Sequence, residues 1–189
     1  MCHALLSDPN FFRLLCRIDE VFARQLYEAK CPVCQSNLHR ANYERKPRAD
    51  ALVLSVVPKQ RLSFCCGRCR KRATPPSVIF LGRRVFLGIV LLLGFGRHAG
   101  QTPAAAQAAL GNPCRQTLAR WRDWWTDAFA RTPPWLTLRG RLDRPVESSE
   151  LPQALVERVA GARAEDRVVI LLRQLSPLST RLAVALVAG

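Results

Sequence analysis

Apolar residues follow a helical period near the N-terminus. They recur at spacings of 4, 3, 4 and 4 residues, at Phe11, Leu15, Ile18, Phe22 and Leu26. This period places them on one face of an α-helix. Asp8 and Pro9 precede the pattern and suit the N-cap and the first helical position. The pattern predicts an amphipathic helix of about 20 residues that leads directly to Cys31.

The helical period is lost between residues 31 and 80. Short apolar runs typical of β-strands occur there, separated by residues that break regular structure, at 51–57, 61–64 and 77–80. We therefore expect a small β module with little apolar core of its own.

Helical patterns return after residue 82. We expect a helix at 83–96, a short helix opened by Thr102 and closed by Gly111, and a longer helix that ends before Pro133. Residues 131–150 show no clear period and predict an irregular polar connector. Short helices should follow it, at 151–160, 164–175 and 178–187.

Positive charge is concentrated in one part of the chain. The sequence has 29 basic and 14 acidic residues, and residues 31–100 alone carry 13 basic and 2 acidic residues. A localised basic segment is the electrostatic pattern of a nucleic-acid-binding protein. A coding bias is the alternative explanation, since 25 of the 29 basic residues are arginine.

Neither a secretory signal nor a membrane span is visible. The N-terminus lacks the charged start and the long apolar stretch of a signal peptide. The longest apolar run, 85–96, has 12 residues, whereas a bilayer-spanning helix needs about 20. We expect a cytoplasmic protein with no membrane partner, in a compartment where disulfides are rare.

Two C-x-x-C pairs stand out among the eight cysteines of the chain. Structural zinc is commonly held by four thiolates in a tetrahedron, and each C-x-x-C turn supplies two corners. Pro32 and Gly67 suit the tight backbone of such turns. We predict one structural Zn²⁺ whose ligands are Cys31, Cys34, Cys66 and Cys69.

Other assignments of these cysteines stay open. A four-thiolate iron–sulfur cluster would also fit, whereas a thioredoxin-like redox site would need one pair beside a βαβ unit, which the pattern lacks. Cys65 and His39 are alternative ligands. We expect Cys65 to point to the opposite face of its strand. The remaining cysteines are expected to be packing residues: Cys2, Cys16 and Cys114.

Residues 102–129 contain two predicted helices joined by a short turn. The second helix has one apolar stripe that should pack inward, formed by Cys114, Leu118, Trp121, Trp125 and Phe129. Gln116 and Arg120 lie opposite the stripe, and Arg115 and Arg122 flank it. Glutamine and arginine suit the edges of adenine and guanine, and the second helix of a helix-turn-helix enters the major groove. A helical hairpin with a solvated charged face is the alternative.

These segments resemble the N-terminal region of bacterial insertion-sequence transposases that begin with a zinc ribbon. The resemblance covers about residues 30–130 and rests on CPVC, LSFCCGRCRKRATPPSVIF and ALGNPCRQTLARWRDWW. It implies that the four cysteines of the two pairs bind zinc. It also implies a DNA-recognition helix that carries Arg115, Gln116, Thr117 and Arg120. The basic run after the second pair, Arg70, Lys71 and Arg72, would contact phosphates.

The chain departs from this family in three respects. The turn GNPC is one residue longer than the common version, and Gln107 stands where a small residue is usual. The catalytic half is also missing. Such transposases cut DNA with three carboxylates on an RNase H-like domain, and only 59 residues follow residue 130. We therefore expect no enzymatic activity.

The sequence predicts an α+β fold, mainly α, and a double-stranded DNA-binding protein associated with the nucleoid. It would be accessory to, or derived from, a mobile-element transposase, acting as a homodimer or with the transposition machinery. The alternative is an adaptor that docks a partner through apolar C-terminal helices. The expected units are an N-terminal helix, a zinc ribbon, a helix-turn-helix-like domain, a connector and a C-terminal helical segment, at 1–30, 31–82, 83–130, 131–150 and 151–189.

Overall fold

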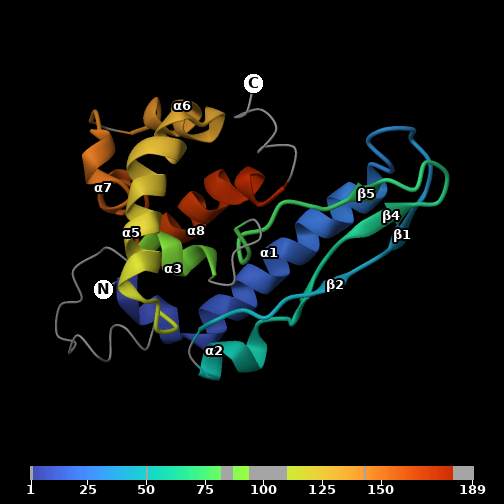
Figure 1. Ribbon diagram of the computed structural model, residues 1–189, viewed down its shortest axis with the longest axis horizontal. Coiled ribbons are helices and arrows are strands. Elements are labelled where there is room, and N and C mark those ends of the chain that lie inside the picture. The colour runs from blue at the N-terminus through green and yellow to red at the C-terminus, as the bar shows by residue number, and fades with distance from the viewer. Residues whose placement is uncertain (1, 50, 82–86, 94–109, 143, 181–189) are drawn as a thin grey trace.

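The computed structural model describes residues 2–49, 51–81, 87–93, 110–142 and 144–180. It is a mixed α+β structure in which helices predominate, as the sequence predicts (Figure 1). The α-helices are α1 (Pro9–Glu28), α2 (Ala51–Val56), α3 (Gly88–Leu93), α5 (Arg115–Asp123), α6 (Pro133–Arg139), α7 (Gln153–Arg158) and α8 (Ala164–Leu175). The shorter helical turns are η1 (Cys2–Ser7), the π-helical η2 (Trp124–Ala128), η3 (Phe129–Arg131), η4 (Ser148–Glu150) and η5 (Ser176–Ser179). The strands are β1 (Leu38–Arg40), β2 (Tyr43–Glu44), β3 (Gln60–Arg61), β4 (Phe64–Cys66) and β5 (Arg72–Ala73).

Helix α1 confirms the N-terminal prediction. The Asp8 carboxylate accepts a hydrogen bond from the Asn10 N–H at 2.8 Å, and Pro9 opens the helix. Phe11, Leu15 and Ile18 of the predicted face are buried. The remaining two positions of that face, Phe22 and Leu26, are half-buried.

Two small antiparallel sheets follow α1. The first has the strand order β1-β4-β5, and the second pairs β2 with β3. Across the first sheet Leu38 lies opposite Cys66, and Phe64 lies opposite Ala73. All four of these side chains are buried, which identifies the inner face of the three-stranded sheet.

Helix α1 contributes to two separate apolar clusters. Phe11, Leu15 and Ile18 belong to a large cluster that contains the later helices. Ala23 and, in part, Leu26 belong to a small cluster with the inner face of the sheet and the buried cysteines. Figure 1 shows α1 running from the helical body to the strands at the far end of the molecule. We call residues 31–73 the cysteine module, and both α1 and the module's own α2, through Val53 and the adjacent Val57, join it to the helical body.

The β-strand predicted at 51–57 is wrong, because Ala51–Val56 forms α2. Val53 and Val57 are both buried, and the Val57 N–H donates to the Val53 carbonyl at 2.9 Å. A spacing of four residues puts both side chains on one helical face. Packing of α2 against α1 and η1 therefore overrides the β preference of valine.

The strand predicted at 77–80 is also wrong. The Asp19 carboxylate accepts hydrogen bonds from the Ser77 hydroxyl and, at 2.7 Å, from the Val78 N–H. The Ser77 hydroxyl oxygen accepts the N–H groups of Ile79 and Phe80 at 3.2 and 2.9 Å. The Ser77 N–H donates to the Ser179 hydroxyl oxygen at 2.8 Å, so the backbone donors that a strand would use in a ladder are held by three side chains. Phe80 forms a single isolated bridge with Leu87.

The connector predicted at 131–150 contains a helix. Thr132 caps α6 by accepting the Trp135 N–H at 3.3 Å, and Pro133 and Pro134 occupy the first helical positions. Prolines are tolerated there because the first turn has no internal partner for its N–H groups. Trp135 and Leu138 are buried, so this segment is part of the core.

The C-terminal helices predicted at 151–160 and 164–175 correspond to α7 and α8, which confirms both. In α8 the apolar face is buried, through Val168, Leu171, Leu172 and Leu175. Residues 176–179 form the turn η5, and most of the third predicted helix lies outside the described residues. Of the helix predicted at 83–96, the structure describes Gly88–Leu93 as α3.

Helix α5 begins after a turn with positive φ at Gly111 (76°) and Asn112 (52°). Trp121, Trp125 and Phe129 are buried as predicted. Cys114 is exposed, which corrects its predicted packing role, because it lies at the N-cap and its sulfur contacts the Thr117 hydroxyl. The first helix of the predicted pair, at 102–111, lies outside the described residues except for its last two positions.

Candidate metal centre

The first cysteine pair lies in a tight turn, residues 31–36, which we call the first knuckle. The Cys31 N–H donates to the Ser36 carbonyl at 3.0 Å, and the Gln35 N–H donates to the Cys31 carbonyl at 2.9 Å. Gln35, directly after Cys34, has a φ of 58°. This left-handed residue turns the chain back into the strand that follows.

The second pair repeats this geometry in residues 66–71, the second knuckle. The Cys66 N–H donates to the Lys71 carbonyl at 3.0 Å, and the Arg70 N–H donates to the Cys66 carbonyl at 3.2 Å. Arg70, directly after Cys69, also has a φ of 58°. Two segments with different intervening residues thus adopt one turn, and each presents two sulfurs.

The two knuckles bring their four sulfurs together. All four sulfur atoms lie within 4.8 Å of one another, with 3.6 Å between Cys31 and Cys69 and 3.4 Å between Cys34 and Cys66. A zinc ion with Zn–S distances of about 2.3 Å requires sulfurs about 3.8 Å apart. Cys31 and Cys66 are buried, and Cys34 and Cys69 are half-buried. The group can therefore hold one metal ion.

The knuckle backbone favours thiolates at the first pair. The N–H and hydroxyl of Ser36 lower the pKa of Cys34 to about 6. The N–H of Val33 lowers the pKa of Cys31. In the second knuckle the Cys69 N–H donates to the Cys66 sulfur at 3.4 Å. Several thiolates at this separation repel one another, and a divalent cation is what would allow all four to ionise together.

The four-sulfur group contains neither of the alternative ligands. The register places His39 opposite Cys65 on the outer face of the sheet, one position away from the inward-facing row of Leu38 and Cys66. The prediction that Cys65 faces away from the site is therefore confirmed.

Gly67 has a different role from the one its turn position predicts. A Cβ atom at this residue would lie 2.8 Å from Nε2 of His39. The imidazole, which belongs to an exposed side chain, would have to rotate away to admit a Cβ atom here. Among the described residues, the glycine with a positive φ is Gly111.

Two buried polar residues, Asp19 of α1 and Arg61 of the cysteine module, were not predicted from the sequence. Both are at most 5% exposed, and Arg61 Nη2 donates to the Pro75 carbonyl. Burial raises the pKa of Asp19 to about 6, and burial lowers the pKa of Arg61. The sequence signal was a carboxylate next to Ile18 on the apolar face of α1. Asp19 fixes the segment after the strands to α1, Arg61 bonds to the same segment, and both lie outside the sulfur group.

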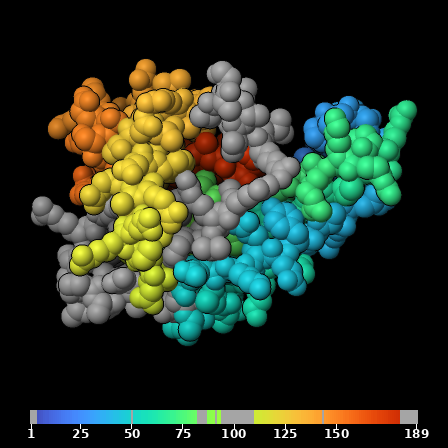
Figure 2. Space-filling model, in the orientation of Figure 1, coloured from blue at the N-terminus to red at the C-terminus, as the bar shows by residue number. Residues whose placement is uncertain are grey.

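The residues predicted to contact DNA lie in two places. On α5, Arg115, Gln116, Arg120 and Arg122 are exposed, and Thr117 is half-buried. On the cysteine module, all three residues of the basic run are exposed, Arg70, Lys71 and Arg72. Figure 2 shows α5, in yellow, on one side of the molecule and the second knuckle, in green, projecting at the other end.

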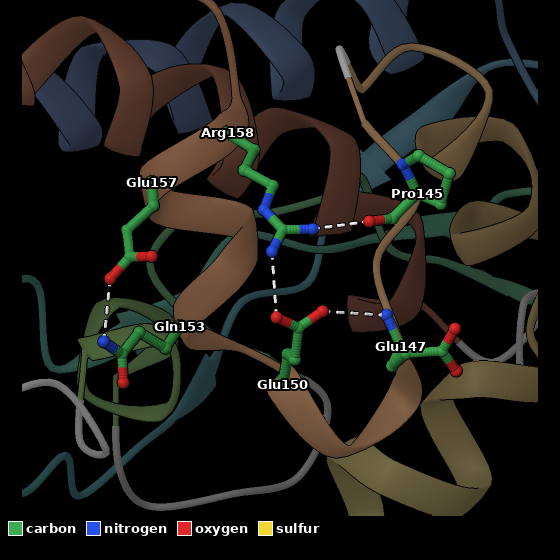
Figure 3. Close-up of polar contacts among 6 residues, drawn as sticks. All are labelled: Pro145, Glu147, Glu150, Gln153, Glu157 and Arg158. Carbon is green, nitrogen blue, oxygen red and sulfur yellow. Dashed lines mark hydrogen bonds and ion pairs between the residues drawn. The ribbon is translucent and has the colours of Figure 1, made fainter.

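Carboxylates of the C-terminal region make local contacts (Figure 3). Glu150 accepts hydrogen bonds from Arg158 Nη2 at 2.8 Å and from the Glu147 N–H at 3.0 Å. Gln153 donates to Glu157 at 2.7 Å. The Arg158 bond ties the end of α7 to η4, the Gln153 bond lies within α7, and the three carboxylates do not belong to the metal-ligand group found in the described residues.

Within the described ranges, no helix has the length and apolarity required to cross a bilayer. Comparisons with protein-family models, with curated proteins and with solved structures find no match for this chain.

Proposed function

We propose that this protein binds double-stranded DNA and that one structural Zn²⁺ holds its cysteine module. The observation that carries the proposal is the convergence of four sulfurs within 4.8 Å in the most basic segment of the chain. Gln35 of the first knuckle and Arg68, Arg70 and Lys71 of the second knuckle are exposed. A rigid basic surface of this kind suits a polyanion.

The zinc would be structural. All four ligands come from cysteine, so a tetrahedral ion has no open position for water or substrate. The small cluster on the inner face of the sheet contains six buried residues, two of which are ligands. So small a core leaves metal binding as a main source of stability for the module.

Two elements would contact the DNA. Arg70 and Lys71 on the second knuckle would neutralise backbone phosphates. Exposed Arg115, Gln116 and Arg120 lie in the first two turns of α5, where they would reach base edges, with Thr117 and Arg122 beside them. The packing of Trp121, Trp125 and Phe129 in the core fixes the opposite side of this helical segment.

A non-enzymatic role agrees with the acidic residues of the C-terminal region. Glu150, Glu157 and Asp166 bond to side chains of neighbouring residues. The resemblance to insertion-sequence transposases supports an accessory or derived protein of a mobile element, at the nucleoid in the cytoplasm, with a second copy or a transposition protein as partner. The adaptor alternative gains less support, because the apolar face of α8 is buried.

The test is duplex binding measured by fluorescence anisotropy between about 50 and about 200 mM salt. We expect log Kd to depend linearly on log salt, with a slope that reflects several phosphate contacts. Alanine at Arg115, Gln116 and Arg120 should weaken binding, whereas alanine at Arg173, an exposed arginine of α8, should not. Absent or salt-independent binding would rule out the proposal.

A further inference from the structure

The outer face of the three-stranded sheet carries one row of functional side chains. Directly paired residues of antiparallel strands share a face, and the register pairs His39 with Cys65 and Cys65 with Arg72. His39 and Arg72 are exposed, and Cys65 is half-buried. The inner face, by contrast, packs against α1 through Phe64 and Tyr27, whose rings lie 5.7 Å apart.

The Arg72 side chain at one end of this row is held in place. Its Nη1 donates to the Ala41 carbonyl and, at 3.0 Å, to the Ser63 hydroxyl oxygen. Its guanidinium lies over the Tyr43 ring, 5.5 Å from the centroid. Among the described residues, Nε and Nη2 of Arg72 have no hydrogen-bond partner.

A fixed guanidinium whose Nε and Nη2 atoms have no partner suits a phosphate group. Most exposed arginines lose side-chain entropy when they bind a ligand. Arg72 is already ordered by the Tyr43 ring and by its two Nη1 hydrogen bonds. Charge near the row is strongly positive. The cysteine module contains two acidic residues, Glu44 and Asp50, against ten lysines and arginines.

We propose that this outer face, the row His39–Cys65–Arg72 with Tyr43 beneath Arg72, holds the DNA backbone at a phosphate bound by Arg72. The inference rests on the proposed function and adds a contact surface to it. A contact to a phosphate positions the backbone and reads no base edge, so this contact is independent of sequence. It places the backbone across the strands, beside the second knuckle.

Two cysteines outside the metal group allow a direct test. Cys65 lies in the middle of the outer row, and Cys114 lies at the start of α5. The zinc-loaded protein is treated with a small alkylating reagent, with and without a duplex whose binding is followed by anisotropy. Peptide mapping then gives the alkylation rate at each cysteine. We expect bound duplex to slow the alkylation of Cys65 severalfold.

The outcomes separate the two proposals. Protection of Cys65, with or without protection of Cys114, supports the outer-face contact. Protection of Cys114 with unchanged Cys65, or bound duplex that protects neither, overturns it while DNA binding stands. No binding by anisotropy removes the proposed function itself.

Variants give an independent measurement. Arg72→Ala should weaken duplex binding roughly tenfold and lower the salt slope by about 1. Tyr43→Leu keeps the charge and removes the supporting ring, and it should weaken binding roughly threefold. The matched control is Arg40→Ala, since Arg40 is exposed and adjacent to His39 but pairs with Phe64 in the inward row. Equal effects of Arg72→Ala and Arg40→Ala, at unchanged zinc content, would contradict the proposal.

Discussion

Cys65 and Cys66 are neighbours in the sequence, yet their side chains lie on opposite faces of one strand. Cys66 is buried, and its sulfur lies close to the sulfurs of Cys31, Cys34 and Cys69. Cys65 lies on the outer face opposite His39. A β-strand alternates its side chains with a period of two, so adjacent positions have different surroundings. The same substitution should therefore have different consequences at the two residues.

Cys66→Ser should abolish tight binding of one zinc per chain, because an alcohol replaces one of four thiolate ligands. Cys65→Ser should keep the metal. Metal analysis of the purified variants, together with their thermal unfolding, measures both effects. Zinc loss in Cys65→Ser and retention in Cys66→Ser would show that the ligand set is wrong.

The packing of His39 on Gly67 leads to a second prediction. Gly67→Ala should displace the exposed imidazole of His39 and destabilise the protein by no more than about 0.5 kcal/mol, because the added methyl group overlaps the end of a side chain that can rotate away. His39→Ala removes the obstacle and should restore most of the loss in the double variant. Urea unfolding of the two single variants and the double variant gives the coupling. Additive effects would show that the contact is not the cause.

At the level of elements, α1 holds the segment after the strands through one carboxylate. Asp19 bonds to Ser77 and Val78, and Ser77 bonds in turn to the N–H of Ile79 and Phe80. Burial raises the pKa of Asp19 from 3.8 to about 6 in the folded protein. Between these values the folded state binds more protons than the unfolded state.

Stability should therefore fall as pH rises from 3.8 to about 6, by up to about 3 kcal/mol from this group. Asp19→Asn cannot ionise and should lack this component. The measurement is the free energy of urea unfolding of both proteins across that range, at constant zinc. Identical pH dependence in the two proteins would contradict the assignment.

At the level of the whole molecule, one helix joins two clusters of unequal size. All four tryptophans, Trp121, Trp124, Trp125 and Trp135, belong to or pack against the large cluster. The knuckles and the three-stranded sheet form the small cluster around ligand sulfurs, whereas Val53 and Val57 of the same module belong to the large cluster. Metal therefore matters to one end of the molecule more than to the other.

Chelation of zinc should unfold the two knuckles and the three-stranded sheet and leave the tryptophan emission spectrum nearly unchanged. The large cluster buries its aromatic rings independently of the sulfurs, and loss of metal removes the ligands that hold the knuckles together. Tryptophan fluorescence and far-ultraviolet circular dichroism with and without chelator test this. A red shift of the emission on chelation would show that the two ends unfold as one unit.

Local patterns were sufficient for several elements. Asp8-Pro9 and the apolar spacing located α1, the apolar face of 164–175 located α8, and the paired spacing of cysteines identified the four sulfurs that meet. Each signal is short-range: a cap, a helical period or a turn that holds two ligands.

Tertiary contacts decided the rest. Residues 51–57 are helical because Val53 and Val57 face α1, and residues 77–80 leave strand geometry because Asp19, 58 residues earlier than Ser77, takes their donors. Residues 133–139 form a helix whose Trp135 completes an aromatic cluster with Phe129. The sequence alone determined which residues can cap a helix, form a helical face or bind a metal ion. Only the tertiary structure decided which group accepts each backbone hydrogen bond and which residues cover each apolar face. The reason is that these partners lie far away along the chain.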